Sequence, residues 1–232
     1  MNFDSAKLLH IGISYVVAPV SEINEEKAHE FSGHLIKAKL GLNDRKFEDG
    51  TVIALRRTPT PLEVKIAFVG PQLVQVLVVA PHPQRAFEIF VEETQEVVAA
   101  FAKTWMQGGF QIIHSDATIR QLYDSSRDHG FSELWEDKLG QRKESLAIFD
   151  RPVQGGGLRF VMPERQDEKD RKKVELKIES FMRDPKQIFV EVQFGWQEPI
   201  VATSVTDFHI ADRLKNLEDF IENRVHKFME RA

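Results

Sequence analysis

The stretch VSEINEEK at residues 20–27 returns as FSELWEDK at residues 131–138, and this repetition decides how the chain is divided. Two shorter matches keep the same order along the chain, LLH at 8–10 with IIH at 112–114, and LEVKI at 62–66 with VELKI at 174–178. Matches in a constant order indicate an internal repeat, and a repeat determines how the whole fold is built. We therefore predict two repeats, residues 1–107 and 108–232, fused as one structural unit.

The first repeat has the pattern of a strand, a helix, three strands and a second helix. Alternating apolar residues predict a strand over 8–17, and Ser21 is placed to cap a helix that ends before Gly41. Proline and glycine then separate three predicted strands, over residues 51–57, 62–68 and 73–80. A long helix with an apolar stripe follows and ends near residues 108–109.

The second repeat shows the same order with longer connections. A strand over 110–117 leads to a helix capped by Ser132, followed by strands over residues 158–162, 174–181 and 188–194. The charged segment 164–173 is interpreted as a solvated hairpin extension, whose basic end could contact an acidic partner. The final helix carries one apolar stripe, formed by Leu214, Leu217, Ile221, Val225 and Phe228.

Each repeat therefore reads β-α-β-β-β-α, which predicts an α+β fold with antiparallel sheets and helices packed on one face. This topology is similar to the tandem halves of TATA-binding-protein-like folds and to helix-grip domains, which clasp ligands between a sheet and a helix. The resemblance implies either a saddle-shaped sheet surface or a pocket under a helix. A fold alone does not fix the function.

The composition is that of an ordinary globular protein of 232 residues, with 42% hydrophobic and 29% charged residues. The chain has no cysteine, which excludes disulfides and thiolate sites and fits a cytoplasmic location. The net charge of −5 disfavours nucleic acid as a partner, because such binding needs a concentrated positive face. The apolar runs are too short for a transmembrane helix, so we expect no contact with a membrane.

Few polar residues are candidates for a site. His10 and His114 occupy matching positions in the two repeats and form the candidate ligand-binding pair. Trp135 stands where the first repeat has Asn24, which indicates either an interface or core packing. The candidates for an interaction surface on the sheet are three strand arginines, Arg56, Arg57 and Arg159.

Known catalytic motifs do not fit the chain. His29 and His34 are one residue too far apart for the helix of a zinc protease, and Gly155–Gly157 precedes no phosphate-loop lysine. We predict no catalytic residue, no metal and no cofactor, and hence a non-enzymatic binding or assembly protein with a protein partner or self-association. The alternatives are a small-molecule-binding protein or enzyme with a pocket between sheet and helices, and a nucleic-acid-binding saddle.

Overall fold

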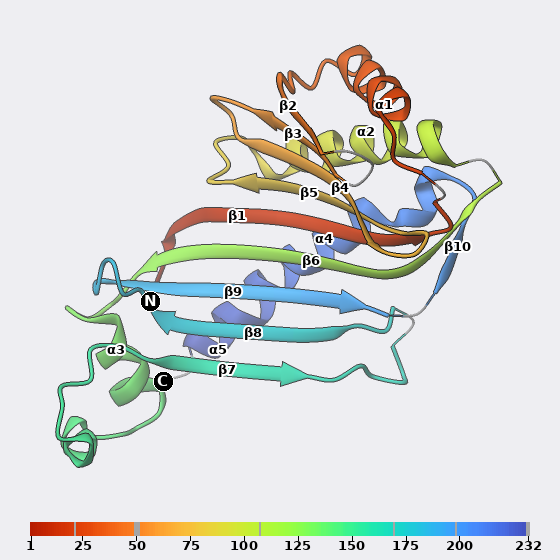
Figure 1. The fold of residues 1–232 in the computed structure, drawn as a ribbon. Coiled ribbons are helices and arrows are strands. Elements are labelled where there is room, and N and C mark those ends of the chain that lie inside the picture. Colours follow the sequence, from red (N-terminus) through yellow and green to blue (C-terminus); the bar gives the residue numbers. More distant parts are fainter. Residues whose placement is uncertain (21, 49–51, 107, 169, 198, 231–232) are drawn as a thin grey trace. The chain divides into compact units, whose positions relative to one another are not determined.

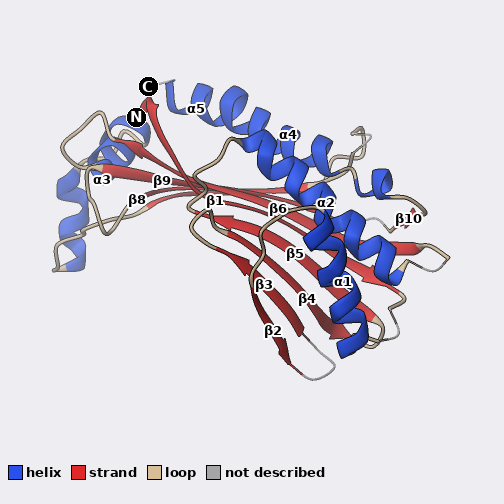
Figure 2. Ribbon diagram, turned by 90° about the horizontal axis from the view of Figure 1, so that it is seen from above, coloured by secondary structure: helices blue, strands red, loops and turns tan. Residues whose placement is uncertain are grey.

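The computed structural model describes the chain except for residues 21, 49–51, 107, 169, 198 and 231–232 (Figure 1). The described part has a mixed α+β fold with a large antiparallel sheet (Figure 2). Among the described helices, none combines the length and the apolar character needed to cross a bilayer.

The first part of the chain contains one strand more than the sequence predicts. The elements are β1 (Asn2–Ala18), α1 (Glu25–Lys37), β2 (Asp44–Glu48), β3 (Val52–Arg57), β4 (Leu62–Gly70), β5 (Leu73–Pro81) and α2 (Phe87–Trp105). The additional strand, β2, has the polar sequence DRKFE and pairs with β3 in an antiparallel register. The predicted start of β3 at Thr51 lies outside the described residues.

The second part of the chain has longer connections and more short helical turns. The elements are β6 (Phe110–Asp124), α3 (Gly130–Ser132), η1 (Glu133–Lys138), η2 (Lys143–Phe149), β7 (Gly157–Met162), β8 (Lys173–Ser180), β9 (Gln187–Trp196) and β10 (Ile200–Ala202). The chain ends in four helical segments, η3 (Val205–Phe208), α4 (Ile210–Phe220), η4 (Ile221–Val225) and α5 (His226–Glu230). The strand β10 is the second one that the sequence did not predict.

The helix caps differ from the two predicted serines. Asn24 caps α1, because its side-chain oxygen accepts the backbone N–H of Lys27 at 2.9 Å. Ser21, the predicted cap, lies outside the described residues. In the second part of the chain the helical turn begins at Gly130, and the ring of His129, rather than the hydroxyl of Ser132, accepts the backbone N–H of Phe131 at 3.2 Å.

The strands are hydrogen-bonded in the order β2-β3-β4-β5-β1-β6-β9-β8-β7, and β10 pairs with β6. The chain divides into two compact units. Unit 1 consists of Met1–Leu9, Thr118–Phe194 and Asn216–Ala232, and unit 2 consists of His10–Ala117 and Gly195–Lys215. Each unit therefore contains residues from both predicted repeats.

The core of unit 2 lies between its strands and its helices. Apolar side chains alternate along the strands because successive residues point to opposite faces, and the inward ones are buried, for example Ile11, Ile13, Val64, Ile66, Val76 and Val78. Phe31 of α1 and Phe101 of α2 are also fully buried, and both rings contact that of Trp105. This burial of large side chains is the main favourable term for folding the unit.

Unit 2 also buries an arginine among aromatic rings. The guanidinium of Arg213 lies over the ring of Trp196 at 4.6 Å and over that of Tyr15 at 5.7 Å, and it donates to the hydroxyl of Ser115. The Tyr15 hydroxyl donates to the backbone oxygen of Phe208 at 3.0 Å. Burial raises the pKa of Tyr15 above its ordinary value, although Arg213 opposes that shift.

The core of unit 1 combines the inward faces of β8 and β9 with the C-terminal helical segments. On β8, Val174, Leu176 and Ile178 are buried and alternate with charged residues, as predicted. Leu217, Ile221 and Val225 of the last helix are also buried. The sheet face and the helix therefore share one core, and residues of both also line a cavity.

Candidate functional site

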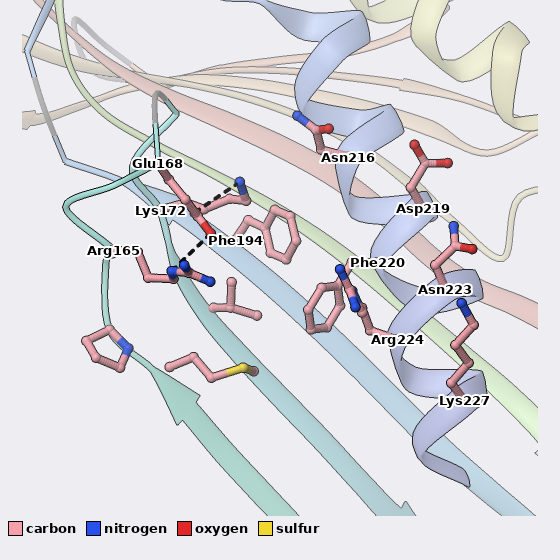
Figure 3. A pocket seen from close by; sticks show the side chains of 13 residues that line it. Arg165, Glu168, Lys172, Phe194, Asn216, Asp219, Phe220, Asn223, Arg224 and Lys227 are labelled. Carbon is pink, nitrogen blue, oxygen red and sulfur yellow. Dashed lines mark ion pairs between the residues drawn. The ribbon is translucent and has the colours of Figure 1, made fainter. Parts of the chain in front are cut away.

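The candidate site is a cavity of about 760 Å³ in unit 1 (Figure 3). It lies between β7, β8 and β9 on one side and the helical residues 216–227 on the other, and the loop before β8 borders it. Ligand pockets in proteins commonly measure about 300–1,000 Å³. The cavity is therefore large enough for a small organic molecule.

The sheet side of the cavity is apolar. Val174 on β8 and Phe194 on β9 are buried and line it, and Met162 at the end of β7 completes this wall. Val174 lies on the same strand face as the core residues Leu176 and Ile178, because alternate residues share a face. The floor of the cavity is thus a continuation of the hydrophobic core.

The helix side of the cavity is mainly polar. Its lining residues recur at the spacing of neighbouring helix turns and are Asn216, Asp219, Phe220, Asn223, Arg224 and Lys227. Among them Phe220 reaches the floor, since its ring meets that of Phe194 edge to face with 5.4 Å between centroids. The final helix therefore carries two stripes, an apolar one in the core and a polar one along the cavity.

The loop before β8 forms the third side of the cavity. Arg165, Glu168 and Lys172 line it, and Lys172 is only 18% exposed, with its ammonium 5.5 Å from the centroid of the Phe194 ring. The segment 164–173, predicted as a solvated hairpin extension, thus contributes part of the cavity wall. Lys172 is held at the cavity floor, where Phe194 offers an aromatic face to its ammonium.

The charges of the cavity wall are unevenly distributed. The loop cations are paired with loop carboxylates, Arg165 with Asp167 at 2.5 Å and Lys172 with Glu168 at 3.7 Å. On the helix side, neither Arg224 nor Lys227 forms an ion pair with any described residue. The helix wall therefore presents unneutralised positive charge to the cavity.

Unit 2 contains a second, smaller cavity of about 460 Å³ beside α2 and the start of α4. Its wall includes Gln95, Glu96, Thr206 and His209. The cavity in unit 1 offers more volume and an aromatic floor, so we take it as the candidate site.

The predicted histidine pair lies on neighbouring strands of unit 2. His10 is on β1 and His114 on β6, where His114 Nε2 lies 2.7 Å from the carboxylate of Asp116. Among the described residues, no group of three or more histidine or acidic side chains is placed to hold a metal ion. A role of the histidine pair in ligand binding stays a prediction.

The three candidate arginines do not share one surface. Arg56 is exposed and pairs with Glu63 at 3.6 Å, and Arg159 pairs with Glu175 at 2.8 Å. Arg57 follows Arg56 directly in β3, so its side chain points to the opposite face, where it is buried and 8% exposed. Arg57 therefore does not belong to an open binding surface.

Trp135 is half-buried on η1 in unit 1. Its ring stacks on Phe131 with 5.8 Å between centroids, and its indole N–H donates to the backbone oxygen of Arg142 at 3.2 Å. These contacts hold a local turn together. The interface that the sequence suggested for this residue stays a prediction.

A network of charges crosses the strands of unit 1 and involves the buried Glu191 on β9. Its carboxylate accepts from Lys177 Nζ at 2.6 Å and from Arg120 Nε at 2.5 Å. Burial alone would raise the pKa of Glu191, but these two hydrogen bonds and charges hold it below the ordinary value of 4.5. The network thus stabilises the folded state only while Glu191 is ionised.

We expect Glu191→Gln to flatten the acid dependence of stability. Folding lowers the pKa of Glu191. Its contribution to stability is therefore fully present above the pKa of the unfolded state, near 4.5, and is lost as the pH falls through the lower pKa of the folded state. The variant should therefore be less stable than the parent at about pH 7, and the difference should shrink at about pH 3. Urea unfolding at the two pH values measures this. The exposed Glu179→Gln on β8 is the control, and equal pH profiles for the parent and Glu191→Gln would contradict the assignment.

Sequence reasoning missed the residues of the cavity. They come from three separate segments, and each is an ordinary charged, polar or apolar residue within its own segment. One signal was present, since Phe220 interrupts an otherwise polar stripe at helical spacing.

No protein-family model matches this chain, and no curated protein sequence matches it. The geometry of the cavity is therefore the basis for a functional assignment.

Proposed function

We propose that this protein binds a small organic molecule in the cavity of unit 1. The observation that carries the proposal is the cavity itself, about 760 Å³ with an apolar floor and a polar helix wall. Small-molecule sites commonly combine a mostly apolar lining with a few polar groups that fix the orientation of the ligand. Phe194 and Val174 supply the apolar lining. The polar groups are those of Asn223 and Arg224.

This proposal selects one of the alternatives that the sequence left open, a pocket between sheet and helices. A nucleic-acid saddle receives less support, because Arg57 is buried and both Arg56 and Arg159 are paired with glutamates. We propose a binding protein rather than an enzyme, since amide, guanidinium and ammonium groups along one helix are suited to holding a ligand.

We further propose that the fold is an internal duplication. The order of strands supports it, because β1 lies beside β5, the last strand of its meander, and β6 likewise lies beside β9. The matched motifs LEVKI and VELKI also fall on corresponding strands, β4 and β8. The lining residues of the unit 1 cavity all lie in the second repeat, so this cavity would then be a feature of that repeat.

We expect Asn223→Trp to block binding of an aromatic probe, 8-anilinonaphthalene-1-sulfonate. Asn223 is an exposed residue of the helix wall, so an indole at this position would occupy the cavity without disturbing the core. The affinity of the probe, measured by fluorescence titration, should fall about tenfold or more, as for other losses of a well-fitting contact.

Glu222→Trp is the matched control, because residue 222 is exposed on the same helix and does not line the cavity. It adds the same fluorophore and removes one negative charge near the cavity, so the affinity for the anionic probe should not fall. If the probe binds Asn223→Trp and the parent equally well, it does not occupy the cavity and the proposed function is wrong.

A further inference from the structure

We infer that the ligand of the unit 1 cavity carries an oxyanion on a flat apolar body, and that Arg224 and Lys227 bind the oxyanion. The inference rests on the proposed function and specifies the chemical class of the ligand. The oxyanion is a carboxylate or a phosphate, because both offer the charge and the acceptor oxygens that such side chains recognise.

The charge of the wall supports an anionic ligand. The chain as a whole carries a net charge of −5, whereas the cavity lining has four cationic side chains, Arg165, Lys172, Arg224 and Lys227, against the two carboxylates of Glu168 and Asp219. A positive cavity in an acidic protein attracts anions locally, since nearby charges act more strongly than distant ones.

Arg224 and Lys227 are the cations that can meet a ligand without first breaking an ion pair. Arg165 and Lys172 are held by Asp167, Glu168 and Asp170 within the loop. Arg224 and Lys227 are three residues apart, so their side chains lie on neighbouring turns of one helix face. The guanidinium supplies a planar fork of donors and the ammonium adds a second charge, which together suit one oxyanion.

The aromatic floor of the cavity indicates that the ligand has a flat apolar body. The Phe220 ring meets the Phe194 ring at 76° between planes, so the two rings form a corner rather than a stack. Val174 and Met162 extend the same apolar wall. A planar ring can lie against one phenyl face and meet the edge of the other, the two arrangements that aromatic rings prefer.

The helix wall also sets the direction of the ligand. Asp219 is nearer the start of the wall, and Lys227 is eight residues further on, which is about 12 Å along a helix. An oxyanion is repelled at the Asp219 end and attracted at the Lys227 end. Arg224 follows Phe220 by four residues, about one helix turn, so the cationic end of the wall adjoins the aromatic floor (Figure 3).

The test compares two probes that differ in one group. 8-Anilinonaphthalene-1-sulfonate and N-phenyl-1-naphthylamine share the same aromatic rings, and only the first carries an anionic sulfonate. We expect the sulfonate probe to bind about tenfold tighter or more, because a charge-assisted contact to arginine adds to the same apolar contacts. In the double variant Arg224→Gln/Lys227→Gln this preference should disappear.

The control is Lys37→Gln/Lys103→Gln, which removes the same charge from exposed helix positions outside the cavity. It should keep the preference for the sulfonate probe. Thermal unfolding of both double variants checks that each is folded. Competition experiments then identify the oxyanion. Displacement of the sulfonate probe by 2-naphthoate indicates a carboxylate, and displacement by 2-naphthyl phosphate indicates a phosphate. The uncharged 2-naphthol is the reference compound.

The outcomes separate this inference from the proposed function. If both probes bind the parent equally and Asn223→Trp blocks both, the cavity binds small molecules and the oxyanion inference is wrong. A preference that survives in Arg224→Gln/Lys227→Gln also overturns the inference, and so does a failure of both naphthyl anions to displace the probe. If the sulfonate probe binds Asn223→Trp as well as the parent, the proposed function fails as well.

Discussion

Leu217→Ala should lower the free energy of unfolding by about 2–5 kcal/mol, the usual cost of truncating a buried leucine. Leu217 lies on α4 with no exposed surface, and Ile221 and Val225 continue the same buried stripe. The loss is large compared with the total stability of a typical protein, about 5–15 kcal/mol. Chemical denaturation followed by circular dichroism measures it.

The matched control for this prediction is Glu222→Ala. Residue 222 is exposed on the same helix, so its truncation should change the unfolding free energy by no more than about 0.5 kcal/mol. If the two variants unfold at the same denaturant concentration, the helix is not packed stably on the sheet. The polar wall of the cavity would then lack its support, since Asn223 and Arg224 lie on the same helix.

The sequence predicted the elements in which burial imposes a clear period. The final helix is an example, because Leu214, Leu217, Ile221 and Val225 recur at helical spacing and are all buried. Phe228 is the exception at 40% exposed, and its ring meets that of Phe160 edge to face. The spacing of apolar residues indicates which face of a helix or strand is buried, but it is less reliable at the end of the element.

The strands β2 and β10 could not be predicted in the same way. In β2, Phe47 is flanked by charged residues, and β10 has only three residues, so neither shows a sustained alternation. Each forms because a neighbouring strand offers unpaired backbone groups, β3 for β2 and β6 for β10. Pairing of this kind depends on the fold as a whole rather than on the local sequence.

The residues of the candidate site could not be predicted from the sequence for a related reason. Lys172, Phe194 and Arg224 are far apart in the chain, and only the packing of a loop, a strand and a helix brings them to one cavity. Arg57 was predicted at the surface, as is usual for a charged residue in a strand, but it is buried. Its burial depends on a carboxylate from another element, which a reading of β3 alone does not reveal.

That carboxylate belongs to Glu93 on α2, and the pair is held by several hydrogen bonds within unit 2. Glu93 accepts from Arg57 Nη1 at 2.6 Å and from Arg57 Nη2 at 3.0 Å, and Arg85 donates to it at 2.7 Å. Arg57 also donates to the backbone oxygens of Leu40 at 2.9 Å and Thr60 at 2.7 Å. The guanidinium thus links α2 to the ends of two loops.

We expect Glu93→Ala to lower the free energy of unfolding by about 3–5 kcal/mol, because it leaves the buried charge of Arg57 without its partner. Glu92→Ala, at the exposed neighbouring position, should have little effect in the same denaturation experiment. The double variant Arg57→Met/Glu93→Leu should recover most of the loss, since apolar side chains of similar size can replace a buried ion pair. Equal stability of Glu93→Ala and Glu92→Ala would show that the pair is solvated and does not anchor the helix. A double variant as unstable as Glu93→Ala would show instead that the hydrogen bonds of Arg57 to Leu40 and Thr60 are the interactions that matter.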